Sequence, residues 1–324
     1  MIPLALDVDT GIDDAFGLLY ALGRPDVTLI GVGAVAGNVS LERATRNTRA
    51  VLALAGRADI PVWPGAGQPL TGSPRDASDI HGETGLGHAT LPEPILAPQP
   101  RHAVDALIAA SHEHAGRLVV VATGPLTNIA LAIARDPAFP RRIARFVAMG
   151  GAFACSGNVT AAAEFNIWHD PEAARMVLRA FSAEGAAPAI VVGLDVTRRT
   201  LLTEADLDQV SRACAGLPRG PALTGFLRDA ARHYFDLMEG RGRPRALVMH
   251  DPLAVAVALD PSLVKTHAVP VDVETQGHLT RGLTLADFRG GAGRIEVAME
   301  VEAARFRDEY LSAIERLAAT RQSA

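Results

Sequence analysis

The amino-acid sequence predicts a single α/β domain with an open, mostly parallel sheet flanked by helices. Three observations lead to this prediction. Short apolar runs alternate with longer helical patterns, a length of 324 residues with 48% hydrophobic content suits one large core, and neither an internal repeat nor a linker divides residues 1–324. Strands that alternate with helices pair in parallel, because each helix carries the chain back across the sheet.

Five apolar runs predict buried strands, since each is aliphatic or β-branched and ends near Gly, Asp, Asn or Thr. They are residues 3–8, 27–35, 117–122, 143–149 and 189–194. The patterns between them predict helices at residues 13–22, 41–55, 103–114, 126–135 and 171–181. A mainly helical stretch at 203–245, two later strands at 269–273 and 295–301, and a closing helix complete the expected order.

The segment at residues 64–100 is rich in Gly and Pro and has no periodicity, which predicts a long irregular loop. Long loops of this kind are often lids, so we expect the part near residues 72–90 to be mobile. Within it, His81 opens the run HGETGLG, whose glycines can bend closely around a ligand. The run lacks the GK[ST] ending of a nucleotide-phosphate loop.

Composition excludes several classes of partner. The formal net charge of −5 and the pI near 6.1 argue against nucleic acid or an anionic membrane. No run is long and apolar enough to span a bilayer, and the N-terminus lacks a basic leader. The two cysteines, Cys155 and Cys214, are too far apart in sequence to predict a disulfide framework or a CxxC metal site. We therefore expect a cytoplasmic protein that binds a small molecule.

The first expected strand runs into four carboxylates, those of Asp7, Asp9, Asp13 and Asp14. Strand alternation puts Asp7 and Asp9 on the same side, and Asp13 and Asp14 begin the next helix. One such aspartate would merely cap a helix, but four repel one another unless a cation or shared protons compensate. Because all the ligands would be oxygens, the predicted ion is Ca²⁺ or Mg²⁺.

Two further groups of residues could form one site together with this acidic cluster. His250 and Asp251 follow an apolar run, and Pro252 after them is typical of an ordinary helix start. If Asp251 completed the same metal shell, His250 could act as a general acid. The second group suits the recognition of sugar hydroxyls, although turn chemistry explains it equally well; it comprises Asn158, Glu164 and Asn166, which Asn38 could join.

Together these motifs resemble one family, the inosine-uridine-type nucleoside hydrolases, over nearly the whole chain. The opening DVDTGIDDA is similar to the family signature DxDxGxDDA, although Thr10 stands where many relatives have proline. The segments HGETGLG, TGPLTNIA, GNVTxxAEFNIxxDPEAA and HDP follow in the family's order. Residues 226–238, where base contacts are expected, match poorly, so the preferred base stays open.

The resemblance implies a Rossmann-like fold, a homodimer or homotetramer, and Ca²⁺-dependent hydrolysis of ribonucleosides to ribose and free base. It implies that Ca²⁺ is bound by Asp9, Asp14, the Thr123 carbonyl and Asp251. It also implies that Asp9 takes a proton from the attacking water and that His250 is the acid for the leaving base. The substrate-binding residues that it implies are Asp13, Asn38, His81, Met149, Asn158, Glu164 and Asn166, with His233 and Tyr234 from the helical region at 203–245.

Two other functions fit parts of the sequence. The pair Asp7-x-Asp9 resembles the nucleophile and acid of haloacid-dehalogenase phosphatases, but Gly11 stands where that class has threonine. A non-enzymatic sensor of a nucleoside or sugar would keep the Ca²⁺ site for binding only. The presence of both Asp9 and His250 argues against a sensor, because binding alone requires neither a base nor an acid.

Overall fold

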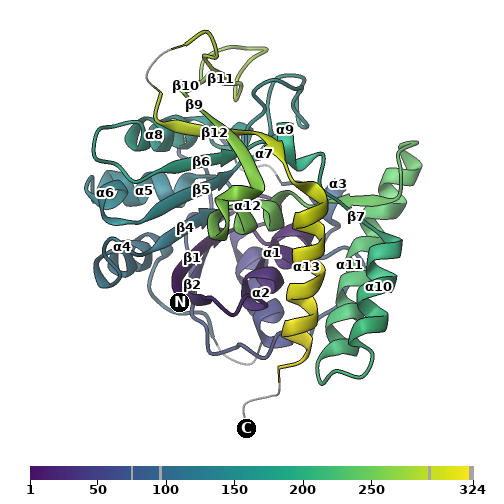
Figure 1. Cartoon of the computed structure of the whole chain (residues 1–324). Helices are drawn as coiled ribbons and strands as arrows, with labels where there is room; N and C mark the ends of the chain where they lie inside the picture. Colours follow the sequence, from purple (N-terminus) through teal and green to yellow (C-terminus); the bar gives the residue numbers. More distant parts are fainter. Residues whose placement is uncertain (74–75, 95–96, 291–292, 321–324) are drawn as a thin grey trace.

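The computed structural model describes residues 1–73, 76–94, 97–290 and 293–320. Within these residues the centre is an eight-stranded sheet in the order β3-β2-β1-β4-β5-β6-β12-β9 (Figure 1). Its strands are β1 Ile2–Val8, β2 Val27–Ala34, β3 Val62–Pro64, β4 Val119–Ala122, β5 Arg145–Met149, β6 Ala189–Val192, β9 Val264–Val269 and β12 Ile295–Val301. Neighbouring strands pair in parallel, except that β9 runs antiparallel to β12.

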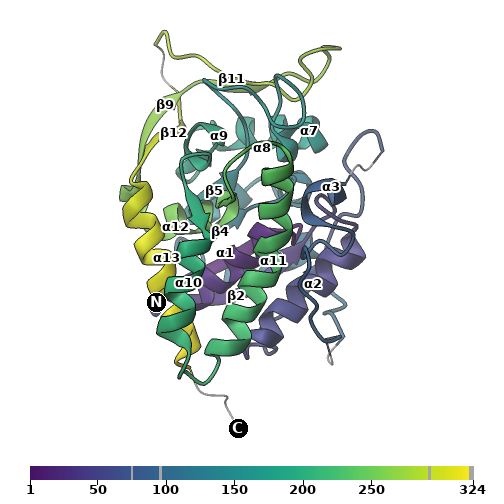
Figure 2. The same ribbon diagram turned by 90° about the vertical axis from the view of Figure 1, so that its right-hand side faces the viewer.

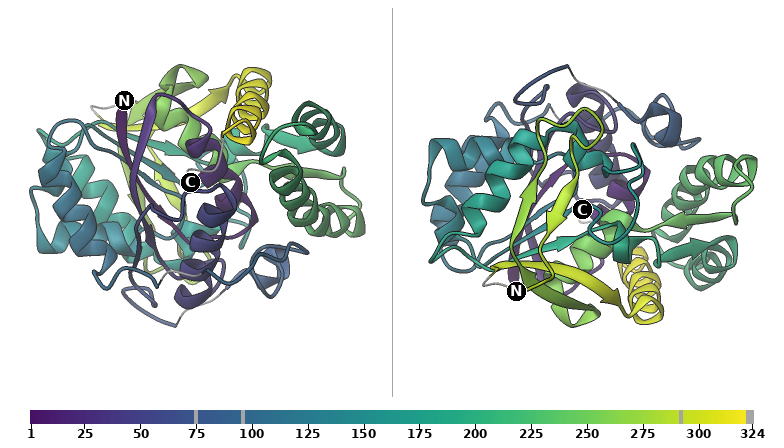
Figure 3. Two further views of the ribbon diagram at one scale, coloured as in Figure 1. Left: turned by 90° about the horizontal axis from the view of Figure 1, so that it is seen from below. Right: turned by 90° about the horizontal axis from the view of Figure 1, so that it is seen from above.

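Helices cover both faces of the sheet, and α10 and α11 form an outer layer on one of them (Figures 2 and 3). That face carries α1 Ile12–Leu22, α2 Leu41–Leu54, α10 Glu204–Cys214, α11 Gly220–Gly240, α12 His250–Leu259 and α13 Ala303–Ala318. The other face carries α4 Ala103–Glu113, α5 Thr127–Arg135, α6 Phe139–Arg142 and α8 Pro171–Phe181. Each face buries its own large apolar cluster against the sheet, which explains why the central strands are apolar on both sides.

Short elements connect these layers. The short helices are α3 Ser78–His81, α7 Phe165–His169, α9 Leu194–Thr197 and the 3₁₀ turn Pro261–Leu263. Two small antiparallel pairs join β7 Leu201–Thr203 to β8 Ala246–Val248, and β10 Val271–Val273 to β11 Thr284–Ala286. No helix among the described residues is long and apolar enough to cross a membrane.

The predicted fold class is confirmed, and the first five expected strands and five expected helices end within two residues of the observed elements. The single strand expected at residues 269–273 is wrong. Pro270 separates β9 from β10, which belong to different sheets, because proline has no N–H with which to continue a ladder. The irregular loop expected at 64–100 contains the end of β3 and the short helix α3, and residues 74–75 and 95–96 lie outside the described part.

The order of the strands creates a crevice beside β1. The chain moves from β1 through α1, β2 and α2 to the edge strand β3, and then returns to place β4 on the other side of β1. At such a switch point the connections leave in opposite directions and open a space beyond the strand ends. The backbone N–H of Thr123, just after β4, donates to the Asp7 carbonyl of β1 at 2.9 Å. The residues that follow these two strands therefore lie close together.

Helix α1 carries the acidic residues and is held rigidly against α12 and α13. The rings of Phe16 and Tyr20 both stack on Tyr310 of α13, with centroids 6.4 and 6.1 Å away. A Cβ at Gly17 would lie 3.5 Å from the backbone of Asp251, which is an ordinary van der Waals distance, so the start of α12 packs directly against α1 here. This packing brings Asp251 next to the acidic residues that begin α1.

Tyrosine hydroxyls in this aromatic cluster provide a test of the packing. The Tyr310 hydroxyl is buried and has no hydrogen-bond partner among the described residues, whereas the Tyr20 hydroxyl accepts from Arg24 at 2.8 Å. We expect Tyr310→Phe to leave the free energy of unfolding unchanged or to raise it by about 1 kcal/mol, and the matched Tyr20→Phe to lower it by about 1 kcal/mol. Urea denaturation measures both changes. A Tyr310→Phe protein that is less stable than Tyr20→Phe would contradict this account of the core.

Candidate active site

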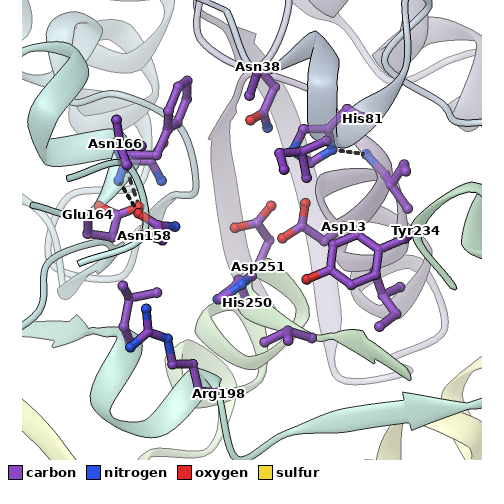
Figure 4. Close-up of a pocket in the computed structure, with 18 of the residues that line it drawn as sticks. Asp13, Asn38, His81, Asn158, Glu164, Asn166, Arg198, Tyr234, His250 and Asp251 are labelled. Atoms are coloured by element: carbon purple, nitrogen blue, oxygen red, sulfur yellow. Dashed lines mark hydrogen bonds between the residues drawn. The ribbon is translucent and has the colours of Figure 1, made fainter. Parts of the chain in front are cut away.

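A cavity of about 840 Å³ opens at the crevice beyond the carboxyl ends of the central strands. Figure 4 shows Asp13 and Asp251 in its middle, with Asn158, Glu164 and Asn166 on one side and His81 and Tyr234 on the other. The walls come from α1, α3, α9, α11 and α12 and from the segments that follow β4 and β5. Polar side chains from segments far apart in the sequence therefore converge on one space.

Three carboxylates meet at the floor of this cavity. Asp13, Asp14 and Asp251 are buried, and each offers an oxygen that lies within 4.8 Å of those of the other two. They stand at the N-termini of α1 and α12, where unpaired N–H groups and the helix dipole favour negative charge. Asp14 is fixed further, because its oxygens accept from the Gly11 N–H at 2.9 Å and from the Thr123 hydroxyl at 2.7 Å.

Burial and mutual repulsion make these carboxylates hard to ionise together. Burial, followed by the charge of Asp14, raises the pKa of Asp13 to about 7. Burial, followed by the charges of Asp13 and Asp14, also raises the pKa of Asp251 well above its ordinary value. Oxygen ligands at this spacing suit a hard divalent cation, which would offset the repulsion. The group could therefore hold a metal ion.

Asp9 lies beside this group but outside the 4.8 Å cluster of the described residues. One of its oxygens accepts from the Asn38 N–H at 2.7 Å, and the other, Oδ1, is buried with no hydrogen-bond partner in the described chain. Burial, then the charge of Asp14, raises its pKa well above the ordinary value. Asp13 Oδ1 is equally without a partner among these residues. The site thus holds two buried oxygens with unused capacity for a cation or a hydroxyl.

The observed cluster overlaps the expected ligand set in Asp14 and Asp251. It also includes Asp13, for which the sequence predicted a role in holding the substrate. The Thr123 carbonyl, another expected ligand, accepts from the Asn166 side-chain amide at 2.6 Å. A carbonyl oxygen has a second lone pair, so this bond leaves room for another contact.

The amide side of the cavity is organised by Glu164. This residue caps α7, and its carboxylate accepts from the backbone N–H groups of Gly151, Asn166 and Ile167 at 3.0–3.1 Å. Burial raises the pKa of Glu164, and these three bonds oppose the shift. The Asn158 side-chain oxygen accepts from the Phe165 N–H at 2.9 Å. The turn chemistry considered for these residues is therefore present, in side chains that also line the cavity.

Two histidines line the cavity as well. His81 ends α3, and its Nδ1 accepts from the Ile12 N–H at 3.1 Å; burial lowers its pKa to about 4. His250 begins α12, and its Nδ1 lies 2.7 Å from the Thr197 hydroxyl. Burial, then the Arg198 charge and His81, lowers the pKa of His250 to about 3. Both imidazoles are consequently neutral near pH 7.

Of the remaining expected residues, Asn38, Met149 and Tyr234 line the cavity and His233 does not. The His233 ring instead packs edge-on against His88, with centroids 5.1 Å apart. Asp7, Asp9 and Asp14 are buried behind the lining, and the Asp7 carboxylate accepts from the Asn128 side-chain amide at 2.8 Å.

Sequence reasoning missed Thr197 and Arg198, which bring side chains to this site from the end of α9. The Arg198 guanidinium lines the cavity and donates to the carbonyls of Ser156 and Gly157 at 2.9 and 2.8 Å. It therefore ties the turn that carries Asn158 to α9. The signal available in the sequence was their position directly after the strand expected at 189–194.

Comparison with known proteins relates the whole chain to one family. The family model for inosine-uridine preferring nucleoside hydrolases matches residues 4–308. The chain is 36% identical to the inosine-uridine preferring nucleoside hydrolase of Leishmania major over 97% of this chain and 98% of that protein. It is 38% identical to the pyrimidine-specific ribonucleoside hydrolase RihA of Klebsiella pneumoniae subsp. pneumoniae over 89% of each chain. The structure of a purine-preferring ribonucleoside hydrolase from Gardnerella vaginalis superposes with a TM-score of 0.90 at 35% identity, over 98% of this chain and 99% of that one.

The three acidic groups predict that a bound metal ion changes which is more stable, the native protein or an Asp251 variant. In the presence of a chelator, Asp251→Asn should be at least as stable as the native protein, because it removes one of three repelling carboxylates. With a divalent cation at about 100 times its Kd, the native protein should gain about 2.7 kcal/mol of unfolding free energy and the variant should gain less. Thermal unfolding with and without Ca²⁺ measures the difference.

Asp7→Asn is the matched control, since Asp7 is buried nearby but lies outside the acidic group. Its effect on stability should be the same with and without the cation. A native protein whose unfolding temperature does not respond to divalent cations, or an Asp251→Asn protein with the full native response, would contradict a metal site here.

Proposed function

The chain belongs to the inosine-uridine preferring nucleoside hydrolase family and is a ribonucleoside N-ribohydrolase. We propose that it works with Ca²⁺ and uses Asp9 as the base that deprotonates water. One observation carries this proposal. Three buried carboxylates and the unpartnered oxygen of Asp9 gather at a cavity that two neutral histidines also line. Such a site can stabilise positive charge at one end of a substrate and a departing base at the other.

The proposed ligands of Ca²⁺ are Asp9, Asp14, Asp251 and the Thr123 carbonyl. The chemistry of the donors supports this choice, because all are oxygens and the carboxylates repel one another without a cation. When bound, such an ion lowers the pKa of a water molecule and offsets the negative charge of the floor. The matching of Asp9 and Asp14 to the family signature adds to the support.

Asp9 is suited to accept a proton. Its Oδ1 is buried and free of hydrogen bonds to other described residues, while the Asn38 N–H holds the other oxygen at 2.7 Å. Burial and the neighbouring Asp14 raise its pKa, and a carboxylate with a raised proton affinity is a better base. We propose that this oxygen receives the proton of the water that attacks C1′ of the ribose.

The ribose would be held by the amide side of the cavity together with Asp13. The proposed contacts are Asp13, Asn38, Asn158, Glu164, Asn166 and the Met149 backbone. Asp13 supports this role because its Oδ1 has unused accepting capacity in the described structure. As the glycosidic bond breaks, the sugar becomes oxocarbenium-like, and nearby carboxylates stabilise its positive charge. The ribose hydroxyls also orient C1′ for attack.

The leaving base would face His81, Tyr234 and His250. The His250 imidazole is neutral near pH 7, because burial and the Arg198 charge lower its pKa to about 3. It can therefore donate one N–H hydrogen bond to the base. Negative charge that develops on the departing base strengthens this hydrogen bond and raises the pKa of the ring, so that His250 can take up a proton from water and pass one to the base. Of the base-facing residues, Tyr234 replaces His233 in this proposal, since only Tyr234 lines the cavity.

The phosphatase alternative has no support at this site. Its nucleophile would be Asp7, whose carboxylate is fully buried and accepts from the Asn128 side-chain amide. The acids of the floor would also repel a phosphate dianion. Hydrolysis therefore fits the charge of the site better than phosphoryl transfer or phosphorolysis does.

We propose a homodimer or homotetramer, as the family resemblance implies, a role in nucleoside salvage, and a cytoplasmic location. Cys155 and Cys214 are both free thiols, which suits a reducing compartment. The names of relatives include inosine-uridine preferring, pyrimidine-specific and purine-preferring enzymes, so they do not define one base.

A panel of nucleosides tests the function directly. We expect release of free ribose from at least one of uridine, cytidine, inosine, adenosine and guanosine in a phosphate-free buffer with Ca²⁺, because water is the proposed nucleophile. A reducing-sugar assay measures the product. Ribose 1-phosphate as the main product, or a rate that rises in proportion to added phosphate, would contradict hydrolysis.

Replacement of Asp9 tests the proposed base. Asp9→Asn should keep the fold and lower kcat by about 10³-fold or more, because one change removes a metal ligand charge and the proton acceptor together; general base catalysis alone contributes about 10²–10⁴. Steady-state kinetics on the best nucleoside of the panel, with circular dichroism as the control for folding, measure the loss. A folded variant with near-native kcat would exclude Asp9 as the base.

A further inference from the structure

The ring of His250 has one hydrogen-bond partner among the described residues, the hydroxyl of Thr197. The distance between His250 Nδ1 and Thr197 Oγ1 is 2.7 Å. Thr197 is fully buried at the end of α9, and its side chain does not line the cavity. This contact joins two segments that are 53 residues apart in the sequence.

The surroundings of the hydroxyl decide the direction of this hydrogen bond. A threonine hydroxyl has one hydrogen to donate, and a neutral imidazole has one nitrogen that donates and one that accepts. In the described structure His250 Nδ1 is the only hydrogen-bond partner of Thr197 Oγ1. If Nδ1 were the donor, the buried hydroxyl hydrogen would have no acceptor, which is unfavourable. Thr197 therefore donates, and Nδ1 accepts.

This direction places the ring hydrogen on the other nitrogen. Nε2 has no hydrogen-bond partner in the described residues and is not shut off from solvent, and His250 lines the cavity. The N–H of the ring is then available to a ligand in the cavity. With the opposite tautomer, the same nitrogen would present a lone pair and could only accept a hydrogen bond.

We propose that Thr197 is a positioning residue whose hydroxyl keeps the hydrogen of His250 on Nε2, where it can be donated to the leaving base. The proposal rests on the function proposed above, in which His250 contacts that base. It assigns to Thr197 no contact with the substrate. Its effect passes entirely through the orientation and tautomer of the His250 ring.

The backbone around Thr197 is held without the help of its side chain. The Met249 N–H donates to the Thr200 carbonyl at 2.9 Å, and β7 pairs with β8 directly beyond this bond. The Thr200 hydroxyl donates to the Thr197 carbonyl at 2.8 Å. Removal of the Thr197 hydroxyl should therefore leave the turn between α9 and β7 in place. Thr200→Val is the control for disturbance of the turn itself, because it removes a buried hydroxyl that bonds the carbonyls of Thr197 and Met249 but not the His250 ring.

The tautomer can be measured without turnover. Nitrogen NMR of the ¹⁵N-histidine-labelled protein with Ca²⁺ bound, assigned by comparison with His250→Gln, distinguishes a hydrogen on Nδ1 from one on Nε2. We expect Nε2–H in the native protein, in Thr197→Ser and in Thr200→Val, and loss of this preference in Thr197→Val. A hydrogen on Nδ1 in the native protein, or an unchanged spectrum in Thr197→Val, would overturn the proposal.

Kinetics on two kinds of substrate provide the second measurement. Thr197→Val should lower kcat on a nucleoside by about 10- to 100-fold, within the range of proton-donor effects, and should change kcat on a nitrophenyl riboside by less than about 3-fold, because that leaving group departs without a proton. Thr197→Ser should restore the nucleoside activity. Thr200→Val should affect both substrates equally.

A double variant tests whether Thr197 acts on catalysis through His250. In a His250→Ala background, Thr197→Val should cause no further loss on the nucleoside, because the residue through which it acts is gone. Additional loss there, or equal losses on both substrates for Thr197→Val, would show a structural role instead. If the native protein released no ribose from any nucleoside, the proposed function would fail, while the NMR measurement would still decide whether Thr197 sets the tautomer.

Discussion

The burial of Asp13, Asp14 and Asp251 in one small space is the constraint on which the rest of the structure depends. Carboxylates at this distance repel one another, so the fold must hold them together by other means. It does so with two helix N-termini that converge beside Gly17 and with neutral hydrogen-bond donors such as the Thr123 hydroxyl. These contacts offset only part of the repulsion, because the pKa values of Asp13 and Asp251 stay raised, so the group favours a bound proton or a cation.

Burial shifts the pKa of the carboxyl groups and of the imidazoles at this cavity in opposite directions, and the result suits cleavage of an N-glycosidic bond. It raises the pKa of the carboxyl groups, including Asp9, and lowers the pKa of His81 and His250. The acids thereby become better proton acceptors, and the imidazoles stay neutral beside the base. A transition state with a positive sugar and a negative leaving group matches this division of charge. One physical cause therefore prepares both ends of the site.

The sequence predicts what is local and misses what depends on packing. Asp13 and Asp14 could be identified because they follow a strand within a few residues, and the alternation of strands and helices is enough to give the parallel sheet. The Thr197–His250 contact could not be found, since nothing local in either segment indicates it. His233 and Tyr234 are neighbours on α11, and only the packing of that helix decides which one faces the cavity.

The two ends of the cavity also differ in how the fold supports them. The acidic floor is built on the central switch point and on helices buried in the core, so changes there disturb stability. The base end is formed by α11 and the segment around α3, which an exposed ion pair between Arg241 and Asp79 joins at 3.7 Å. Exposed pairs of this kind contribute little to stability. Substitutions at the base end should therefore disturb the stability of the fold less than substitutions at the floor; the names of relatives include both pyrimidine-specific and purine-preferring enzymes.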